Sequence, residues 1–133
     1  MKKLIVLLAL TFPLLANPAL FSKYESVRQS LLKEDLAGAK KHAAALATDA
    51  KTAKNATVAE LAQSVAKSND LDGARRSFSM LSDELIKVRN TTKGARPAVY
   101  HCPMVKKSWL QPKGQIGNPY DSAMAMCGVL KAE

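Results

Sequence analysis

The residues best suited to chemistry lie near the end of the chain, within residues 99–128. This stretch contains both cysteines, the only tryptophan, one of the two histidines and three of the five methionines. Two clusters mark it, His101-Cys102-Pro103-Met104 and Met124-Ala125-Met126-Cys127. Thiolate and thioether sulfur are soft donors that, together with an imidazole, suit Cu(I) or Ag(I). Zinc takes cysteine and histidine but rarely methionine. The composition of the stretch therefore predicts a soft-metal site.

The spacing within each cluster indicates which side chains can share one ion. If the first cluster is extended, Cys102 and Met104 point to the same side, because side chains alternate along a strand. If the second cluster is a helical turn, Met124 and Cys127 share a face at i, i+3. The predicted ligands are Cys102, Met104, Met124 and Cys127, with His101 and Met126 as additional candidates.

A disulfide is the alternative use of the same two cysteines, and it is the commoner one in exported chains. A Cys102–Cys127 bridge would close a loop of about 25 residues and stabilise the fold by roughly 3 kcal/mol in the chain-entropy model. The methionines would then be ordinary fillers of a small core. The two hypotheses compete, because an oxidised pair supplies no thiolates. A redox-linked site that alternates between the two states is a third hypothesis.

Several residues of this stretch resemble an uncharacterised family of bacterial exported helical domains. The resemblance is carried by Tyr100-His101-Cys102-Pro103-Met104, Trp109-Leu110, Asn118-Pro119-Tyr120 and Met124-x-x-Cys127-Gly128, and it extends over residues 20–130. Such domains also occur fused to periplasmic adaptor subunits of copper/silver-type efflux pumps. The resemblance implies a role in metal efflux, with Cu(I) or Ag(I) as the ion and a periplasmic efflux adaptor or a metallochaperone as the partner.

The chain departs from the related patterns at two points. Its Cys-Pro-Met is similar to the Tyr-x-Cys-Pro-Met-His-Pro core of small heavy-metal-binding domains, but Val105 and Lys106 replace the His-Pro. After Tyr120, Asp121-Ser122 stands where the family has a glycine. The turn that follows Tyr120 is therefore expected to differ from that of the family.

Composition limits the classes of protein to consider. The chain has 133 residues, enough for one domain, and a net charge of +9. The basic excess is best explained by lysines on solvated helix faces, and no basic–aromatic interleaving indicates nucleic-acid binding. The sequence has no Ser-His-Asp set, phosphate-binding glycine loop or HExxH motif, and a thiol oxidoreductase would more usually carry Cys-x-x-Cys. We therefore expect a protein that is not an enzyme.

The first residues are typical of a secretory signal. Met1-Lys2-Lys3 precedes an apolar run of about twelve residues, too short for a bilayer span, which needs ~20. Cleavage after Ala16 or Ala19 is expected, so that residues 1–19 are the signal peptide and no membrane span follows. Removing Lys2 and Lys3 lowers the net charge from +9 to +7. The mature protein, residues 20–133, is expected in the periplasm or outside the cell.

Apolar residues three and four positions apart predict four helices within residues 20–93. The repeating positions are Tyr24, Val27 and Leu31, then Leu36, Ala39, Ala43, Leu46, Ala50 and Ala53, then Val58, Leu61, Ala62 and Val65, and finally Leu71, Ala74, Phe78, Leu81, Leu85 and Val88. The expected N-terminal caps are Asp35, Thr57 in a Thr57-x-x-Glu60 capping box, and Asn69 or Asp70.

These elements predict an all-α fold, an antiparallel four-helix bundle joined by short loops. Residues 94–133, with several prolines and glycines, are expected to form an irregular extension that packs back on the bundle. Trp109 is the expected anchor of this extension, with a buried ring whose N–H needs an acceptor. The extension would carry the cysteines and methionines, so its packing on the bundle would position any site.

Overall fold

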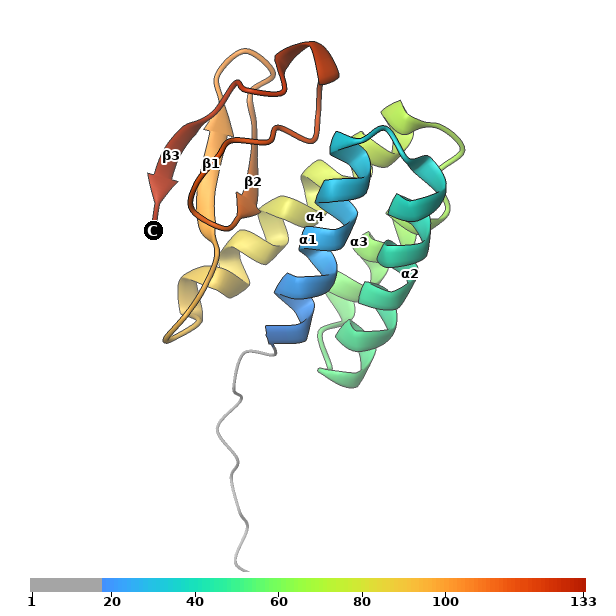
Figure 1. The fold of residues 1–133 in the computed structure, drawn as a ribbon. Helices are drawn as coiled ribbons and strands as arrows, with labels where there is room; N and C mark the ends of the chain where they lie inside the picture. The colour runs from blue at the N-terminus through green and yellow to red at the C-terminus, as the bar shows by residue number, and fades with distance from the viewer. Residues whose placement is uncertain (1–17) are drawn as a thin grey trace, which may run out of the picture.

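The computed structural model describes residues 18–133, so nearly all of the predicted signal segment lies outside the described residues. Four helices are followed by a small sheet (Figure 1). The elements are α1 (Pro18–Leu32), α2 (Leu36–Thr52), α3 (Ala56–Ala66), α4 (Leu71–Thr91), β1 (Ala98–Cys102), β2 (Lys107–Gln111), the 3-10 turn η1 (Ser122–Met124) and β3 (Val129–Ala132). The prediction of an all-α fold is wrong. None of the described helices is long and apolar enough to cross a membrane.

The four predicted helices are confirmed, and most of their repeating apolar positions are buried. Leu36, Ala53, Leu61, Leu71 and Val88 are only partly buried and pack around the edge of the core. Consecutive helices lie against each other, and α4, the longest at 21 residues, continues beyond the others to contact β2 (Figure 1). The helical bundle therefore presents the C-terminal half of α4 as a support for the sheet.

The caps of the helices agree with the sequence in two cases and differ in one. Asp35 accepts a hydrogen bond from the N–H of Gly38, and Asp70 accepts one from the N–H of Gly73. The capping box at Thr57 is wrong, because α3 begins earlier and its cap is Asn55, which accepts from the N–H of Val58. Asparagine is the stronger N-cap of the two, which agrees with the earlier start of α3.

The prediction that residues 94–133 are irregular is also wrong, because three antiparallel strands form there in the order β2-β1-β3. Val99 pairs with Leu110, and Tyr100 pairs with Trp109. Large and β-branched side chains of this kind fit a pleated, half-buried surface. On the other side of β1, Tyr100 pairs with Leu130 and His101 with Val129, with a bulge near Val99.

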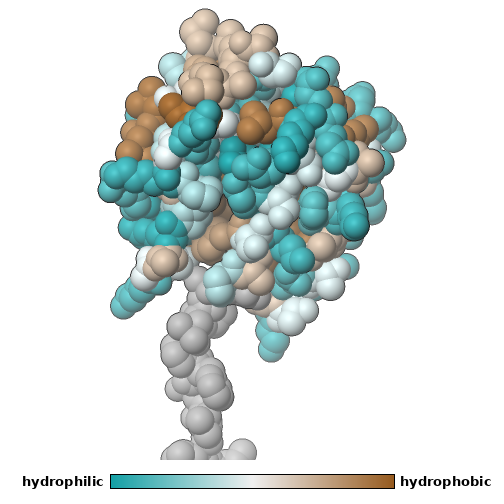
Figure 2. Space-filling model, viewed as in Figure 1, coloured by the Kyte–Doolittle hydropathy of each residue, from teal (hydrophilic) through white to brown (hydrophobic). Residues whose placement is uncertain are grey.

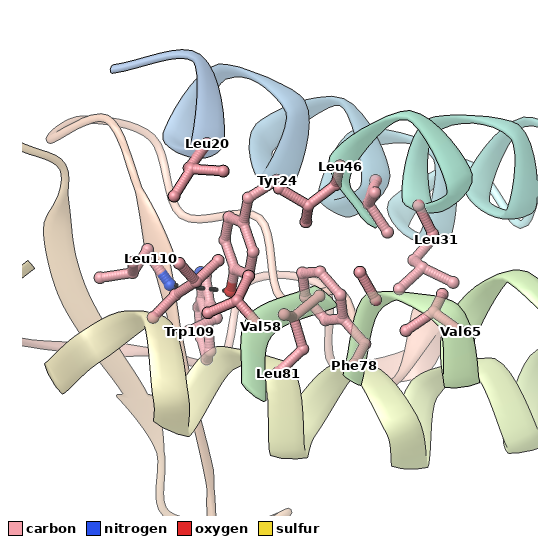
Figure 3. Close-up of a cluster of buried hydrophobic side chains, with 14 of the residues drawn as sticks. Leu20, Tyr24, Leu31, Leu46, Val58, Val65, Phe78, Leu81, Trp109 and Leu110 are labelled. Carbon is pink, nitrogen blue, oxygen red and sulfur yellow. Dashed lines mark hydrogen bonds between the residues drawn. The ribbon is translucent and has the colours of Figure 1, made fainter. Parts of the chain in front are cut away.

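Helices and sheet share one core (Figure 3). The ring of Tyr24 on α1 stacks on Phe78 of α4 with 4.7 Å between centroids. The hydroxyl of Tyr24 accepts a hydrogen bond from the backbone N–H of Leu110 on β2, at 3.1 Å. Trp109 is fully buried, which confirms it as the anchor of this region. The sheet is therefore held on the bundle by buried contacts of both polar and apolar groups.

Candidate functional site

The two cysteines meet at one end of the sheet and form a disulfide. Cys102 is the last residue of β1, and Cys127 lies two residues before β3. Their Cα atoms are 5.3 Å apart although 25 positions separate them in the sequence. Cys102 is fully buried, whereas Cys127 is half-buried. The disulfide that was the alternative to thiolate ligands is present in the structure.

Two methionines stand exposed beside this bridge. Met104, in the turn between β1 and β2, has 69% of its surface exposed, and Met126, next to Cys127, has 63%. Met124 is half-buried, and its backbone oxygen accepts hydrogen bonds from Cys127 and Asn118. Figure 2 shows moderately hydrophobic surface at the end of the molecule where the β1–β2 turn and η1 lie. The structure thus gathers both cysteines and three methionines near one surface.

His101 lies on the other face of β1. Neighbouring residues of a strand point to opposite faces, and His101 lines an open pocket with Val99, Ser108 and Asp83, away from Cys102. Its Nδ1 atom is 2.8 Å from Oγ of Ser108 on the paired strand. The structure therefore separates His101 from the cysteines. Within residues 18–133, no group of three or more histidine, cysteine or acidic side chains is placed to hold a metal ion.

Gln111 organises the backbone that leads from β2 towards the site. Its buried Oε1 accepts hydrogen bonds from the indole N–H of Trp109 at 2.9 Å and from the N–H of Gly117 at 3.1 Å. Its Nε2 donates to the carbonyl of Gln115 at 2.9 Å. Gln111 is the acceptor that the indole N–H of Trp109 was expected to need. Nothing in the sequence pattern identified Gln111 for that role.

Asn118 connects this loop to η1. Its backbone N–H donates to the carbonyl of Ala125 at 2.8 Å. Its side-chain amide donates to the backbone carbonyl of Met124 at 3.2 Å. Its Oδ1 also accepts from the N–H of Tyr120 at 2.9 Å, a local turn of the Asx type. This turn and the two hydrogen bonds to η1 fix the segment that carries Met124 and Cys127.

Two arginines of the helices donate hydrogen bonds to the loop that contains Gly117 and Pro119. Arg28 of α1 is buried, donates to the carbonyl of Gly117 at 2.6 Å and pairs with Glu25. Arg75 of α4 donates to the carbonyl of Pro119 at 3.0 Å. These arginines are 89 and 44 positions from their partners, so helical periodicity alone could not reveal their roles.

A cluster of three hydroxyl groups joins the helices to the strands. Tyr24 and Tyr120 lie 2.6 Å and 2.9 Å from Oγ of Ser82, which donates to the carbonyl of Phe78. Tyr120 also donates to the carbonyl of Ser108 at 2.6 Å. Burial raises the pKa of both tyrosine hydroxyls well above the ordinary value, despite the hydrogen bonds to Ser82. Both tyrosines therefore stay protonated and act as structural donors.

The end of the sheet thus combines a fixed frame with soft donor atoms at its surface. Buried hydrogen bonds hold the loop that carries the second cluster, and the bridge joins that loop to β1. With the bridge closed, only thioether sulfur is available to a soft ion. With the bridge open, two thiolates become available in addition.

Comparison with known proteins adds a family and no activity. The family described as a protein of unknown function (DUF3347) matches residues 20–96. This match spans the four helices and ends before β1, so it does not include the disulfide or the methionines beside it. No curated protein and no solved structure matches the chain.

Proposed function

This chain belongs to the family described as a protein of unknown function (DUF3347), and we propose that it is a periplasmic protein that binds Cu(I) or Ag(I). The ion binds at the Cys102–Cys127 end of the sheet after the bridge has been reduced. The protein then buffers the ion or delivers it to a heavy-metal efflux system. A periplasmic efflux adaptor or a metallochaperone is the partner that such a role requires.

The observation that carries the proposal is the convergence of Cys102 and Cys127, whose Cα atoms lie 5.3 Å apart. Two thiolates on one ion need their sulfur atoms about 4 Å apart, because each metal–sulfur bond is about 2.3 Å long. A thiol reductant that supplies two electrons and two protons converts the bridge into two thiols at this range. Binding of the ion then displaces the thiol protons.

The exposed methionines support the choice of a soft ion. Met104 follows Cys102 by two positions, Met126 directly precedes Cys127, and both side chains are free to turn towards an ion. Thioether sulfur selects Cu(I) or Ag(I) over hard ions such as Mg²⁺. Met124 is a further candidate but is half-buried, and His101 is the least favourably placed because it faces away from the cysteines.

The test is a titration of the reduced protein with Cu(I), without oxygen, against a chromophoric chelator that competes for the ion. We expect one ion bound with a Kd below about 1 µM, which corresponds to about −8 kcal/mol. Cys102→Ser should abolish this binding, and Met104→Ser with Met126→Ser should weaken it. Met80→Ser is the matched control, because Met80 is equally exposed but lies on α4. Binding weaker than micromolar in the wild type would end the proposal.

A second candidate function is that of a disulfide-stapled interaction module without metal, and the closed bridge with its buried Cys102 favours it. In that case Cys102→Ser mainly lowers the free energy of unfolding, by about 3 kcal/mol in the chain-entropy model. The exported protein should then contain no free thiol, and Cu(I) should not protect the reduced cysteines from alkylation. Alkylation of the reduced protein with and without Cu(I) distinguishes the two functions, because only a bound ion protects the two thiols.

A further inference from the structure

The outer edge of β3 is open. β3 lies at one side of the sheet, and within residues 18–133 its backbone pairs only with β1 (Figure 1). The opposite edge strand, β2, packs against α4. An unpaired strand edge offers a row of N–H and C=O groups that another extended chain can pair with. The outer edge of β3 can therefore pair with a further strand.

Apolar side chains stand on both faces of the same strand. Val129 has 53% of its surface exposed, and Leu130 has 37%. Val129 pairs with His101 and Leu130 with Tyr100, so the two side chains lie on opposite faces of the sheet. Figure 2 shows strongly hydrophobic surface on the side of the molecule where β3 lies. A strand added here would cover an apolar side chain on each face.

Charge indicates what kind of strand would be accepted. Lys131 is exposed within β3 and forms no ion pair among the described residues, although Asp83 of α4 lines the same open pocket. Glu133 is already paired with Lys113. Lysine on an edge strand opposes pairing with a second copy of the same basic chain, because like charges would face each other. A strand with acidic side chains meets the opposite sign.

We infer that β3 accepts an extended segment of a different protein as a fourth strand, and that this segment alternates apolar with acidic residues. Backbone hydrogen bonds to the β3 edge supply affinity, and the side chains opposite Val129, Leu130 and Lys131 supply specificity. The inference is independent of the proposed metal site. It is also distinct from the disulfide, which holds β3 in place because Cys127 is tied to the end of β1.

The experiment selects binders from a library of short random peptides displayed on phage, with the oxidised protein immobilised. We expect enriched peptides that combine alternating apolar residues with Asp or Glu. Backbone amide NMR shifts caused by the best peptide should concentrate at residues 129–132. Methylation of the peptide nitrogens that face β3 should abolish binding, whereas methylation of the alternate nitrogens should not, since only the first set donates to the strand.

Charge reversal at one residue gives the decisive comparison. Lys131→Glu should weaken binding of the acidic peptide by about tenfold. A phage selection with this variant immobilised should enrich peptides with Lys or Arg. Met80→Ser, which changes an exposed apolar residue on α4, should leave binding unaltered. Failure to enrich any peptide, enrichment without acidic residues, shifts centred elsewhere, or self-pairing of the wild type through β3 would each overturn the inference.

Discussion

Gly128 lies directly against the buried ring of Trp109. A Cβ atom at Gly128 would come within 2.9 Å of Cη2 of Trp109 and within 2.9 Å of Cγ2 of Ile116. Such a distance is well inside normal carbon–carbon contact, which is about 3.5 Å or more. The glycine therefore lets the chain turn from Cys127 into β3 across the face of the anchor residue.

The first prediction concerns this contact. Gly128→Ala should lower the free energy of unfolding by about 1–3 kcal/mol, the usual cost of forcing extra volume into a packed region. In a Trp109→Phe background the cost should be smaller, because phenylalanine lacks the two ring atoms that approach Gly128 most closely. Urea denaturation of the four variants of this cycle measures the coupling. An equal cost in both backgrounds would contradict the contact.

The second prediction concerns the hydroxyl cluster. Ser82→Ala leaves the buried hydroxyl of Tyr24 without the acceptor at 2.6 Å and should cost about 1–3 kcal/mol. Ser64→Ala is the matched control, because the hydroxyl of that exposed helical serine donates to the carbonyl of Glu60 within its own helix. Thermal and urea unfolding compare the two variants. Equal effects of the two substitutions would show that the buried cluster adds no stability.

The third prediction is a loss of stability at alkaline pH. Burial raises the pKa of Tyr24 and Tyr120 in the folded chain, whereas unfolded tyrosines ionise near pH 10. The contribution of these tyrosines is therefore fully present below about pH 10 and falls above it, by about 1.4 kcal/mol per pH unit for each tyrosine. Urea titrations over this range should show a shallower fall for Tyr24→Phe. An unchanged slope would contradict the burial of that hydroxyl as its cause.

The fourth prediction tests which residue begins α3. Asn55→Ala removes the side-chain acceptor for the N–H of Val58 and should cost about 1 kcal/mol. Thr57→Ala, inside the first turn, should change stability by less than about 0.5 kcal/mol. Urea denaturation separates the two values. The reverse order would restore Thr57 as the cap.

The helices were predictable because their signal is local. Residues such as Phe78, Leu81 and Leu85 repeat at helical spacing, and the structure buries all three. The sheet was not predicted because its strands have only four or five residues, too few for a period to stand out. A hairpin signal was nevertheless present, since Val99-Tyr100 and Trp109-Leu110 are β-forming pairs on either side of Pro103.

The site was predictable in part, because the chain has two cysteines that could pair. Sequence reasoning offered the Cys102–Cys127 bridge as the alternative to a metal site, but the exposure of Met104 and the position of His101 depend on how β1 and the turn after it pack on the bundle. The roles of Gln111 and Arg28 depend on partners that the fold brings to them from other elements or loops. No spacing rule identifies such partners, because they are set by the tertiary packing of the strands on the helices.

The contacts of Tyr24, Arg28 and Ser82 with the C-terminal third have a practical consequence for anyone who trims this protein. The family match ends at residue 96, which invites truncation of the chain at that residue. Cutting at that point would strip the bundle of β2 and of the loop around Tyr120, which cover these polar groups and the aromatic rings beside them. The remaining fragment would expose a contiguous apolar surface and would tend to aggregate.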